Sequence, residues 1–181
     1  RRRHTRWTSM SRGLGDVYKR QMVVWMRKSS GHGRPELSFW EEKSLAEMSQ
    51  DEWESLCDGC ARCCMIKLEN EDDGTIHHTG LVCHLLDIDK CRCTSYSKRH
   101  ELVPDCIEFG ADIVAQLSWL PTTCAYRRLA EGKPLSWWHP LVSGSAESVH
   151  AAGISVRDRV IPEHMVHEDD LEEHIVHWVE T

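Results

Sequence analysis

The alternation of apolar and polar residues between positions 37 and 181 predicts short structural elements. Ser49-Gln50-Asp51-Glu52 has the pattern of a capping box, in which a serine and a glutamate satisfy each other's backbone amides. We therefore expect a helix from about residue 50 toward the first cysteines. Residues 65–82 alternate on both sides of the turn-rich NEDDG stretch at 70–74, which is typical of a β-hairpin with Asp73-Gly74 at its turn.

The remaining pattern predicts further short elements. A helix capped by Thr122 or Thr123 should cover 123–131 and end at Gly132. Residues 154–161 alternate like a strand, and residues 168–178 have the periodicity of an amphipathic helix. Short helices are also expected over 94–103, over 111–118 and from Ser145 to Gly153. Elements of this length bury little surface each, so another interaction must help to hold them together.

Cysteine is the residue that could supply this interaction, since the chain has nine of them, at 57, 60, 63, 64, 83, 91, 93, 106 and 124. The run CDGCARCC at 57–64 is spaced C-x-x-C-x-x-C-C. On a helix, Cys57, Cys60 and Cys64 would fall within about 60° of one another and face a single centre, with Cys63 pointing away. A disulfide framework is disfavoured, because the count is odd and no secretory signal is evident.

The thiols instead predict a metal site. Soft thiolates select zinc, copper(I) or iron–sulfur clusters. The C-x-x-C-x-x-C run is typical of bacterial iron–sulfur sites, whereas all-cysteine zinc sites usually combine two separate C-x-x-C pairs. Here the second pair is Cys91-Arg92-Cys93, which fits a zinc ribbon imperfectly. Zinc and iron, including an iron–sulfur cluster, both stay open.

A series of ordered blocks carries a family resemblance over residues 39–178. The blocks are CDGCARCC, CHLL (83–86), CRCTSY (91–96), PDC (104–106), TTCAYRRLAEG (122–132), WWHPLVSG (137–144), AGISVR (152–157) and EDDLEEHIVHW (168–178). Together they resemble the YcgN-type branch of the C-x-x-C-x-x-C-C cysteine-cluster family, described as zinc- or iron-chelating. The resemblance implies eight metal ligands: Cys57, Cys60, Cys63, Cys64, Cys83, Cys93, Cys106 and Cys124. Cys91 is the additional thiol, and Ser95 departs from the wider family, which has Ile at that position.

The predicted fold class is α+β, with mainly short α-helices and one β-hairpin, organised around one or more cysteine-ligated metal centres. We assign residues 39–181 to the cysteine-cluster domain and residues 22–38 to a linker or native N-terminal arm. The first 36 residues hold ten of the 22 Lys and Arg residues but only two of the 29 Asp and Glu residues. Because SRGLGDVYKRQ (11–21) resembles an adaptor-derived fragment, we interpret residues 1–21 as non-native.

Other candidate residues are given structural interpretations. Histidines spaced like ligand pairs lie on acidic segments and are expected to be solvated: His164 with His167, and His174 with His177. His77 and His78 are also expected at the surface, and His139 in the core. Four tryptophans are expected to pack around the metal centre: Trp53, Trp119, Trp137 and Trp138. Arg127 and Arg128 could either neutralise the thiolates or face water.

The function indicated is a cytoplasmic metal-binding protein that acts in redox chemistry or metal handling. Because the body of the chain is acidic and no apolar run approaches about 20 residues, neither nucleic acid nor a membrane is an expected partner. A structural zinc module that docks on a protein partner is one alternative. A group-transfer enzyme is another, since a wider relative carries the domain in a flagellin lysine N-methylase. The sequence has no glycine-rich cofactor loop, so whether the protein is an enzyme stays open.

Overall fold

The computed structural model describes residues 37–181, and its helix α3 (Gln50–Ser55) confirms the predicted capping box. Ser49 Oγ accepts a hydrogen bond from the backbone amide of Glu52 at 3.3 Å, and the Glu52 carboxylate accepts one from the amide of Ser49 at 2.8 Å. The helix ends at Ser55, so the chain leaves the helical conformation before it reaches Cys57.

All helical elements of the described residues are short. The other α-helices are α2 (Phe39–Glu42), α4 (Arg99–Leu102), α5 (Ala111–Val114), α6 (Ala125–Ala130), α7 (Pro140–Ser143) and α8 (Ser148–Ala151). The 3-10 segments are Leu45–Glu47, Arg62–Cys64, Tyr96–Lys98, Glu163–Met165 and Glu168–His174. Between residues 37 and 181, no helix is both long enough and apolar enough to cross a membrane. The interpretation of residues 1–21 as non-native lies outside the described residues.

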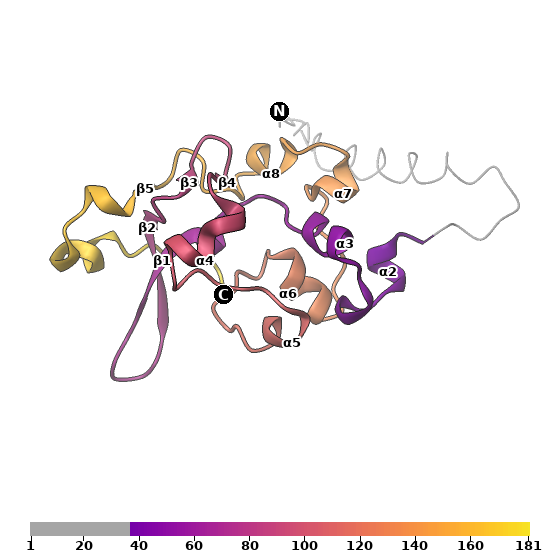
Figure 1. The fold of residues 1–181 in the computed structure, drawn as a ribbon, viewed down its shortest axis with the longest axis horizontal. Helices are drawn as coiled ribbons and strands as arrows, with labels where there is room; N and C mark the ends of the chain where they lie inside the picture. Colours follow the sequence, from indigo (N-terminus) through magenta and orange to yellow (C-terminus); the bar gives the residue numbers. More distant parts are fainter. Residues whose placement is uncertain (1–36) are drawn as a thin grey trace, which may run out of the picture. The chain divides into compact units, whose positions relative to one another are not determined.

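The predicted hairpin is confirmed as strands β1 (Met65–Glu69) and β2 (Ile76–Val82), which pair antiparallel (Figure 1). At its turn, Gly74 has a φ of +70°, a conformation that costs glycine little, and the Asp73 carboxylate accepts a hydrogen bond from the amide of Thr75. Strand β5 (Ile161–Pro162) adds in parallel to the other edge of β2, so the sheet order is β1-β2-β5.

A second, two-stranded sheet follows the hairpin along the chain. Strand β3 (Leu86–Asp87) pairs antiparallel with β4 (Arg92–Cys93), with Leu86 opposite Cys93. The amide of Thr94 also donates to the carbonyl of Leu85 at 2.8 Å. Through this pairing the chain runs back toward the end of β2. Cys93 therefore lies beside the segment that starts at Cys83.

The core consists of two hydrophobic clusters. One lies under the sheets and contains Ala61, Met65, Val82, Leu86, Cys91 and Val156, with Trp178 packed against it. The other lies among the helices and contains Leu56, Val114, Leu120 and Tyr126, with Trp53 packed against it. His139 is 2% exposed and contacts the carbonyl of Leu56 through Nε2 at 2.9 Å, which confirms its expected place in the core. The fold is thus a mixed α+β arrangement of short helices with a small sheet.

The strand expected over residues 154–161 is wrong for most of its length. The chain turns at Asp158, whose φ is +62°, and only Ile161 at the end of that range belongs to β5. The amide of Val156 donates to the carbonyl of Cys60 at 3.0 Å. The backbone of this segment therefore hydrogen-bonds to the cysteine loop, and an alternation of apolar and polar side chains cannot reveal such a long-range backbone contact.

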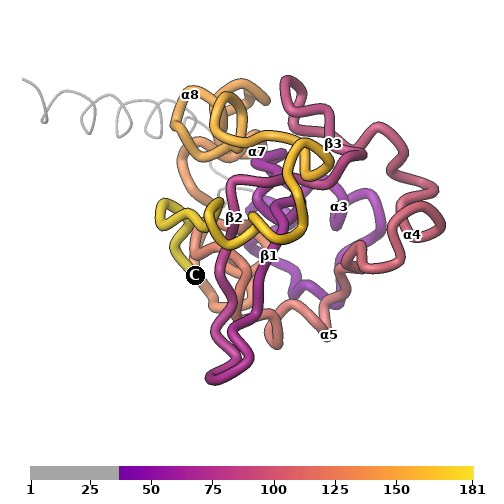
Figure 2. The backbone as a smooth tube through the Cα atoms, turned by 90° about the vertical axis from the view of Figure 1, so that its left-hand side faces the viewer, coloured from indigo at the N-terminus to yellow at the C-terminus, as the bar shows by residue number. Residues whose placement is uncertain are grey.

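The amphipathic α-helix expected over 168–178 is also wrong. Residues Glu168–His174 form a 3-10 segment, and the chain then becomes extended. Ile175 forms a bridge with Thr79, and the amide of Val176 donates to the carbonyl of His78 at 2.8 Å. Figure 2 shows this C-terminal segment, in yellow, running beside β1 and β2. Pairing with the edge of β2 ends the helical segment before its apolar stripe is complete.

The remaining helices are shorter than predicted. The range 94–103 contains a 3-10 turn followed by α4, and the range 111–118 contains only α5. Helix α8 lies within the range expected after Ser145, and Gly153 follows it with a φ of +68°. The positions of these elements were therefore predictable, but their lengths were overestimated.

Candidate metal centre

The loop that carries the first four cysteines is not helical, so the predicted helical arrangement of these thiols is wrong. Gly59 and Ala61 have φ angles of +76° and +59°, which turn the backbone between Cys57 and the 3-10 turn at Arg62–Cys64. The carboxylate of the buried Asp58 accepts a hydrogen bond from the amide of Cys60 at 3.0 Å. The loop is thus folded back on itself, and Cys57 and Cys60 both interact with Cys63.

Four of the eight predicted ligands interact electrostatically: three from this loop and one from the start of α6. We call them the first cysteine group: Cys57, Cys60, Cys63 and Cys124. Burial, together with the neighbouring Cys63, raises the pKa of Cys57 and of Cys124 to about 12. Burial raises the pKa of Cys60 well above its ordinary value, with Asp58, Cys63 and Cys124 adding to the shift. These thiols cannot ionise together unless a cation compensates them.

The other four predicted ligands adjoin the first group. We call them the second cysteine group: Cys64, Cys83, Cys93 and Cys106. The amide of Cys83 donates to the carbonyl of Cys64 at 3.0 Å. Burial raises the pKa of Cys83 and of Cys106, and Cys93 contributes to both shifts. The two groups meet at the Cys63–Cys64 pair, where a hydrogen bond between the thiols lowers the pKa of Cys63 to about 7 and raises that of Cys64.

Two cationic side chains, one half-buried and one buried, lie next to the cysteine groups. Lys67 donates hydrogen bonds to the carbonyls of Cys63 and Met65 at 2.9 and 2.7 Å, and its Nζ lies 4.2 Å from the centre of the Trp119 ring. Burial lowers the pKa of Lys67, and Cys63 opposes that shift. Arg62 is 4% exposed and donates to the carbonyl of Ile154 at 2.6 Å.

These cations make the site suitable for a metal held by thiolates. Four thiolates around one divalent ion leave a net negative charge, and burying that charge is costly without a nearby cation. Burial lowers the pKa of Arg62 as well, whereas the negative charge of a nearby Cys60 thiolate would raise it. The donor set and its surroundings therefore fit a soft or borderline metal ion.

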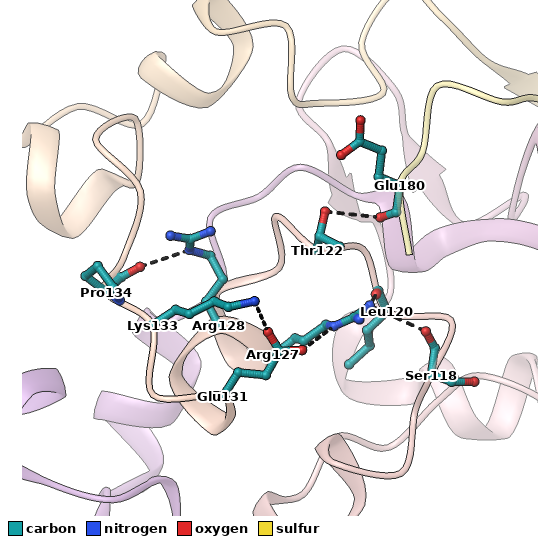
Figure 3. A network of polar contacts seen from close by, with 9 residues as sticks. All are labelled: Ser118, Leu120, Thr122, Arg127, Arg128, Glu131, Lys133, Pro134 and Glu180. Carbon is teal, nitrogen blue, oxygen red and sulfur yellow. Dashed lines mark hydrogen bonds and ion pairs between the residues drawn. The ribbon is translucent and has the colours of Figure 1, made fainter.

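A network of polar contacts holds the segment that carries Cys124 (Figure 3). Arg127 donates to the carbonyls of Ser118 and Leu120 and pairs with Glu131 at 2.8 Å, so it secures the backbone and does not neutralise thiolates. Arg128 donates to the carbonyl of Pro134 at 2.9 Å. Both arginines were expected either to neutralise the thiolates or to face water. Their side chains instead donate hydrogen bonds to backbone carbonyls and so hold this segment in position.

The predicted threonine cap of α6 is wrong, because both hydroxyls bind elsewhere. The hydroxyl of Thr122 donates to the carbonyl of Glu180 near the C-terminus, as Figure 3 shows, and that of Thr123 accepts from Arg62 at 3.3 Å. Cys124 itself is the N-cap residue. The tertiary contacts of the two threonines therefore place Cys124 at the start of α6, on the side that faces the cysteine loop.

Cys91 lies apart from the two cysteine groups. It is 3% exposed, has a φ of +50° and packs in the hydrophobic cluster under the sheets. Its thiol donates to the carbonyl of Ile88 at 3.3 Å. Cys64 of the second group packs against the same cluster, but Cys91 is itself one of the buried residues that form it.

The expectation for His78 is wrong. His78 is 3% exposed, and burial together with Lys67 and Arg62 lowers its pKa to about 4. It lies on β2 and faces Trp119, with ring centres 6.4 Å apart. Trp137 is also misassigned, because it is 58% exposed. Trp53 packs on Tyr126, with ring centres 4.7 Å apart, in the cluster that also contacts Cys57 and Cys124.

Two residues near Cys83 were not identified from the sequence. His84 and Glu163 place potential ligand atoms within 4.8 Å of each other and of the Cys83 sulfur. His84 directly follows a predicted ligand, which is a weak signal. Glu163 lies 79 residues further along the chain, and no local pattern marks it.

Comparisons with known proteins identify the family of this chain. Residues 56–125 match the CxxCxxCC family, described as "Putative zinc- or iron-chelating domain". The chain is 55% identical over 144 residues to a UPF0260 protein of Marinobacter nauticus, covering 80% of this chain and 97% of that protein. It is 57% identical over 141 residues to a UPF0260 protein of Rhodopseudomonas palustris, covering 77% of this chain and 83% of that protein.

A third relative, the UPF0260 protein of Cellvibrio japonicus, is 53% identical over 141 residues, which cover 78% of this chain and 96% of that protein. No solved structure matches the chain. The resemblance to the cysteine-cluster family is thus confirmed: the chain belongs to the UPF0260 family, and its C-x-x-C-x-x-C-C segment lies in the part that matches the model described as "Putative zinc- or iron-chelating domain".

Proposed function

We propose that this protein binds two zinc or iron centres, one through each cysteine group. The observation that carries the proposal is the pattern of interactions among the thiols: Cys57, Cys60 and Cys124 interact with Cys63, whereas Cys83 interacts with Cys64, Cys93 and Cys106. Cys63 also interacts with Cys64 and Cys106, so the two groups are neighbours. Four thiolates complete the coordination of a tetrahedral zinc ion and also match the ligand number of an iron–sulfur cluster.

The metal would form part of the fold in both centres. The first group connects the 57–63 loop to Cys124, and the second connects Cys64 to three segments further along the chain. A bound ion would therefore link the two hydrophobic clusters, which contain only short elements. Lys67 and Arg62 would offset the negative charge of the thiolate-bound metal. Metal binding then adds directly to the free energy of folding.

We further propose a cytoplasmic location and a role in metal handling or redox chemistry. Unpaired thiols persist in a reducing compartment, and all nine cysteines are free here. The acidic body disfavours nucleic acid, and we propose no membrane partner. A protein partner is compatible with a structural zinc centre, and group transfer would require a second substrate site close to the metal.

Metal analysis of protein purified without oxygen tests this function. We expect about two zinc ions for each chain, or iron with sulfide and a visible charge-transfer absorption. The variants Cys60→Ser and Cys64→Ser should each lose metal, while Cys91→Ser is the matched control that keeps it. Freshly purified, reduced protein that neither contains nor takes up zinc or iron would refute the proposal. Turnover with a methyl donor would favour the group-transfer alternative.

A further inference from the structure

Cys83, His84 and Glu163 bring three kinds of metal ligand to one place. Their potential ligand atoms all lie within 4.8 Å of one another. His84 Nδ1 lies 2.7 Å from Glu163 Oε1, and the backbone amide of His84 donates to the same oxygen at 2.9 Å. The second bond holds the carboxylate beside the Cys83-His84 segment whatever the protonation of the imidazole.

The sheet explains why these residues meet. Strands β2 and β5 run parallel, with Leu81 opposite Ile161 and Val82 opposite Pro162. The same register, continued by one residue, places Cys83 opposite Glu163 at the ends of the two strands. Neighbouring parallel strands end at the same edge of a sheet, so a ligand after one strand naturally faces a ligand after the next. Figure 1 shows β2 and β5 side by side.

The distances leave room for a metal ion after a small adjustment. Ligand atoms about 2.0–2.1 Å from a tetrahedral zinc ion lie about 3.3 Å apart, and a zinc-bound sulfur lies about 3.6 Å from a nitrogen or oxygen ligand. The contact between His84 and Glu163 must therefore open by less than about 1 Å. Rotation of these two surface side chains can supply that movement.

The three side chains are open to solvent. The His84 side chain is 47% exposed, that of Glu163 is 32% exposed, and Cys83 is half-buried. An exposed ion pair alone contributes little to stability and does not require a thiol beside it. A set of one thiolate, one imidazole and one carboxylate suits a borderline ion such as zinc, and three protein ligands leave a position for water.

We propose that Cys83, His84 and Glu163 form a solvent-accessible binding site for a divalent transition-metal cation of the zinc type. The ligands are the Cys83 thiolate, the His84 imidazole and the Glu163 carboxylate, and water completes the coordination. Because Cys83 also belongs to the second cysteine group, a cation here shares a ligand with that group. This site is therefore the route by which metal enters or leaves the second centre, a role that rests on the proposed function above.

Cobalt(II) titration of the purified, reduced protein tests the site directly. We expect wild-type protein to take up one cobalt equivalent beyond the metal it retains, with thiolate-to-cobalt absorption. His84→Ala and Glu163→Gln should each weaken this uptake at least about tenfold. His164→Ala is the matched control, since His164 is an exposed neighbour of Glu163, and it should bind cobalt like the wild type.

Three results overturn the site: wild-type protein that takes up no further cobalt, unchanged cobalt affinity in both variants, or bound cobalt without thiolate absorption. Exchange of retained zinc against isotopically labelled zinc tests the entry route, and His84→Ala should slow that exchange several-fold. An unchanged exchange rate would overturn the route. In protein that neither contains nor takes up zinc or iron at the two cysteine groups, uptake of one cobalt equivalent that depends on His84 would support the site while refuting the proposed resident centres.

Discussion

Replacing Cys60 by serine should remove metal and leave most of the described domain unfolded. Cys60 is 9% exposed and interacts with Cys63 and Cys124, so it lies in the interior of the first cysteine group. Serine can neither supply a soft thiolate nor ionise at neutral pH. The variant therefore loses the ligand and also buries a hydroxyl in its place.

The expected size of the effect follows from the structure. The longest α-helices within residues 37–181 have six residues, and helices this short are marginal without tertiary partners. Structural zinc contributes about 10–16 kcal/mol in small domains, while the net stability of a typical domain is about 5–15 kcal/mol. Loss of the first centre alone should therefore remove all or nearly all of the net stability.

Cys91→Ser is the matched control for this experiment. Cys91 is buried in the hydrophobic cluster under the sheets, and a serine hydroxyl can replace its hydrogen bond to Ile88. We expect retained metal and a loss of about 1–3 kcal/mol, the usual cost of placing a hydroxyl in an apolar environment.

Metal content, circular dichroism and urea denaturation of both variants measure these effects. Wild-type protein and Cys91→Ser should unfold cooperatively, whereas Cys60→Ser should show weak near-ultraviolet signals and no cooperative transition. A metal-free Cys60→Ser variant with native circular dichroism and a cooperative transition would show that the cysteine centre does not hold the fold.

Three further substitutions test individual contacts. Ser49→Ala should destabilise the protein by about 1 kcal/mol, because it leaves the amide of Glu52 without its cap; equal urea midpoints would contradict this. His78→Phe should flatten the pH dependence of stability between about pH 6.5 and 4. In the wild type, the folded state keeps His78 neutral in this window, whereas the unfolded state binds a proton. The stability of the wild type therefore falls by about 2–3 kcal/mol as the pH drops from 6.5 to 4. Parallel wild-type and variant curves would refute that assignment. Arg127→Ala should cost about 1–3 kcal/mol by depriving the carbonyl of the buried Leu120 of a donor, and an unchanged melting temperature would rule out the positioning role.

Local signals in the sequence were sufficient for several features. The Ser49–Glu52 capping box and the Asp73-Gly74 turn each depend on residues three or fewer positions apart, and both are present in the structure. The ordered sequence blocks over residues 39–178, the cysteine run at 57–64 among them, likewise identified the family, because each block is a local pattern. The acidic body and the free thiols also limited the classes of function without reference to the fold.

Long-range contacts decided the remainder. The 168–178 segment has a helical pattern, but pairing of Ile175 with Thr79 ends its helical part at His174. Cys63 and Cys64 are adjacent in sequence, yet Cys57 and Cys60 interact with Cys63, whereas Cys83 interacts with Cys64. No local periodicity encodes either outcome.

The position of Glu163 beside Cys83 depends most clearly on tertiary structure. It follows from the parallel register of β2 and β5, whose residues are 80 positions apart along the chain. The sequence by itself determined which residues can bind metal, since donor chemistry belongs to each side chain. Only the tertiary structure decided which donors share a centre, because ligand geometry depends on distances in space that separation along the chain does not specify.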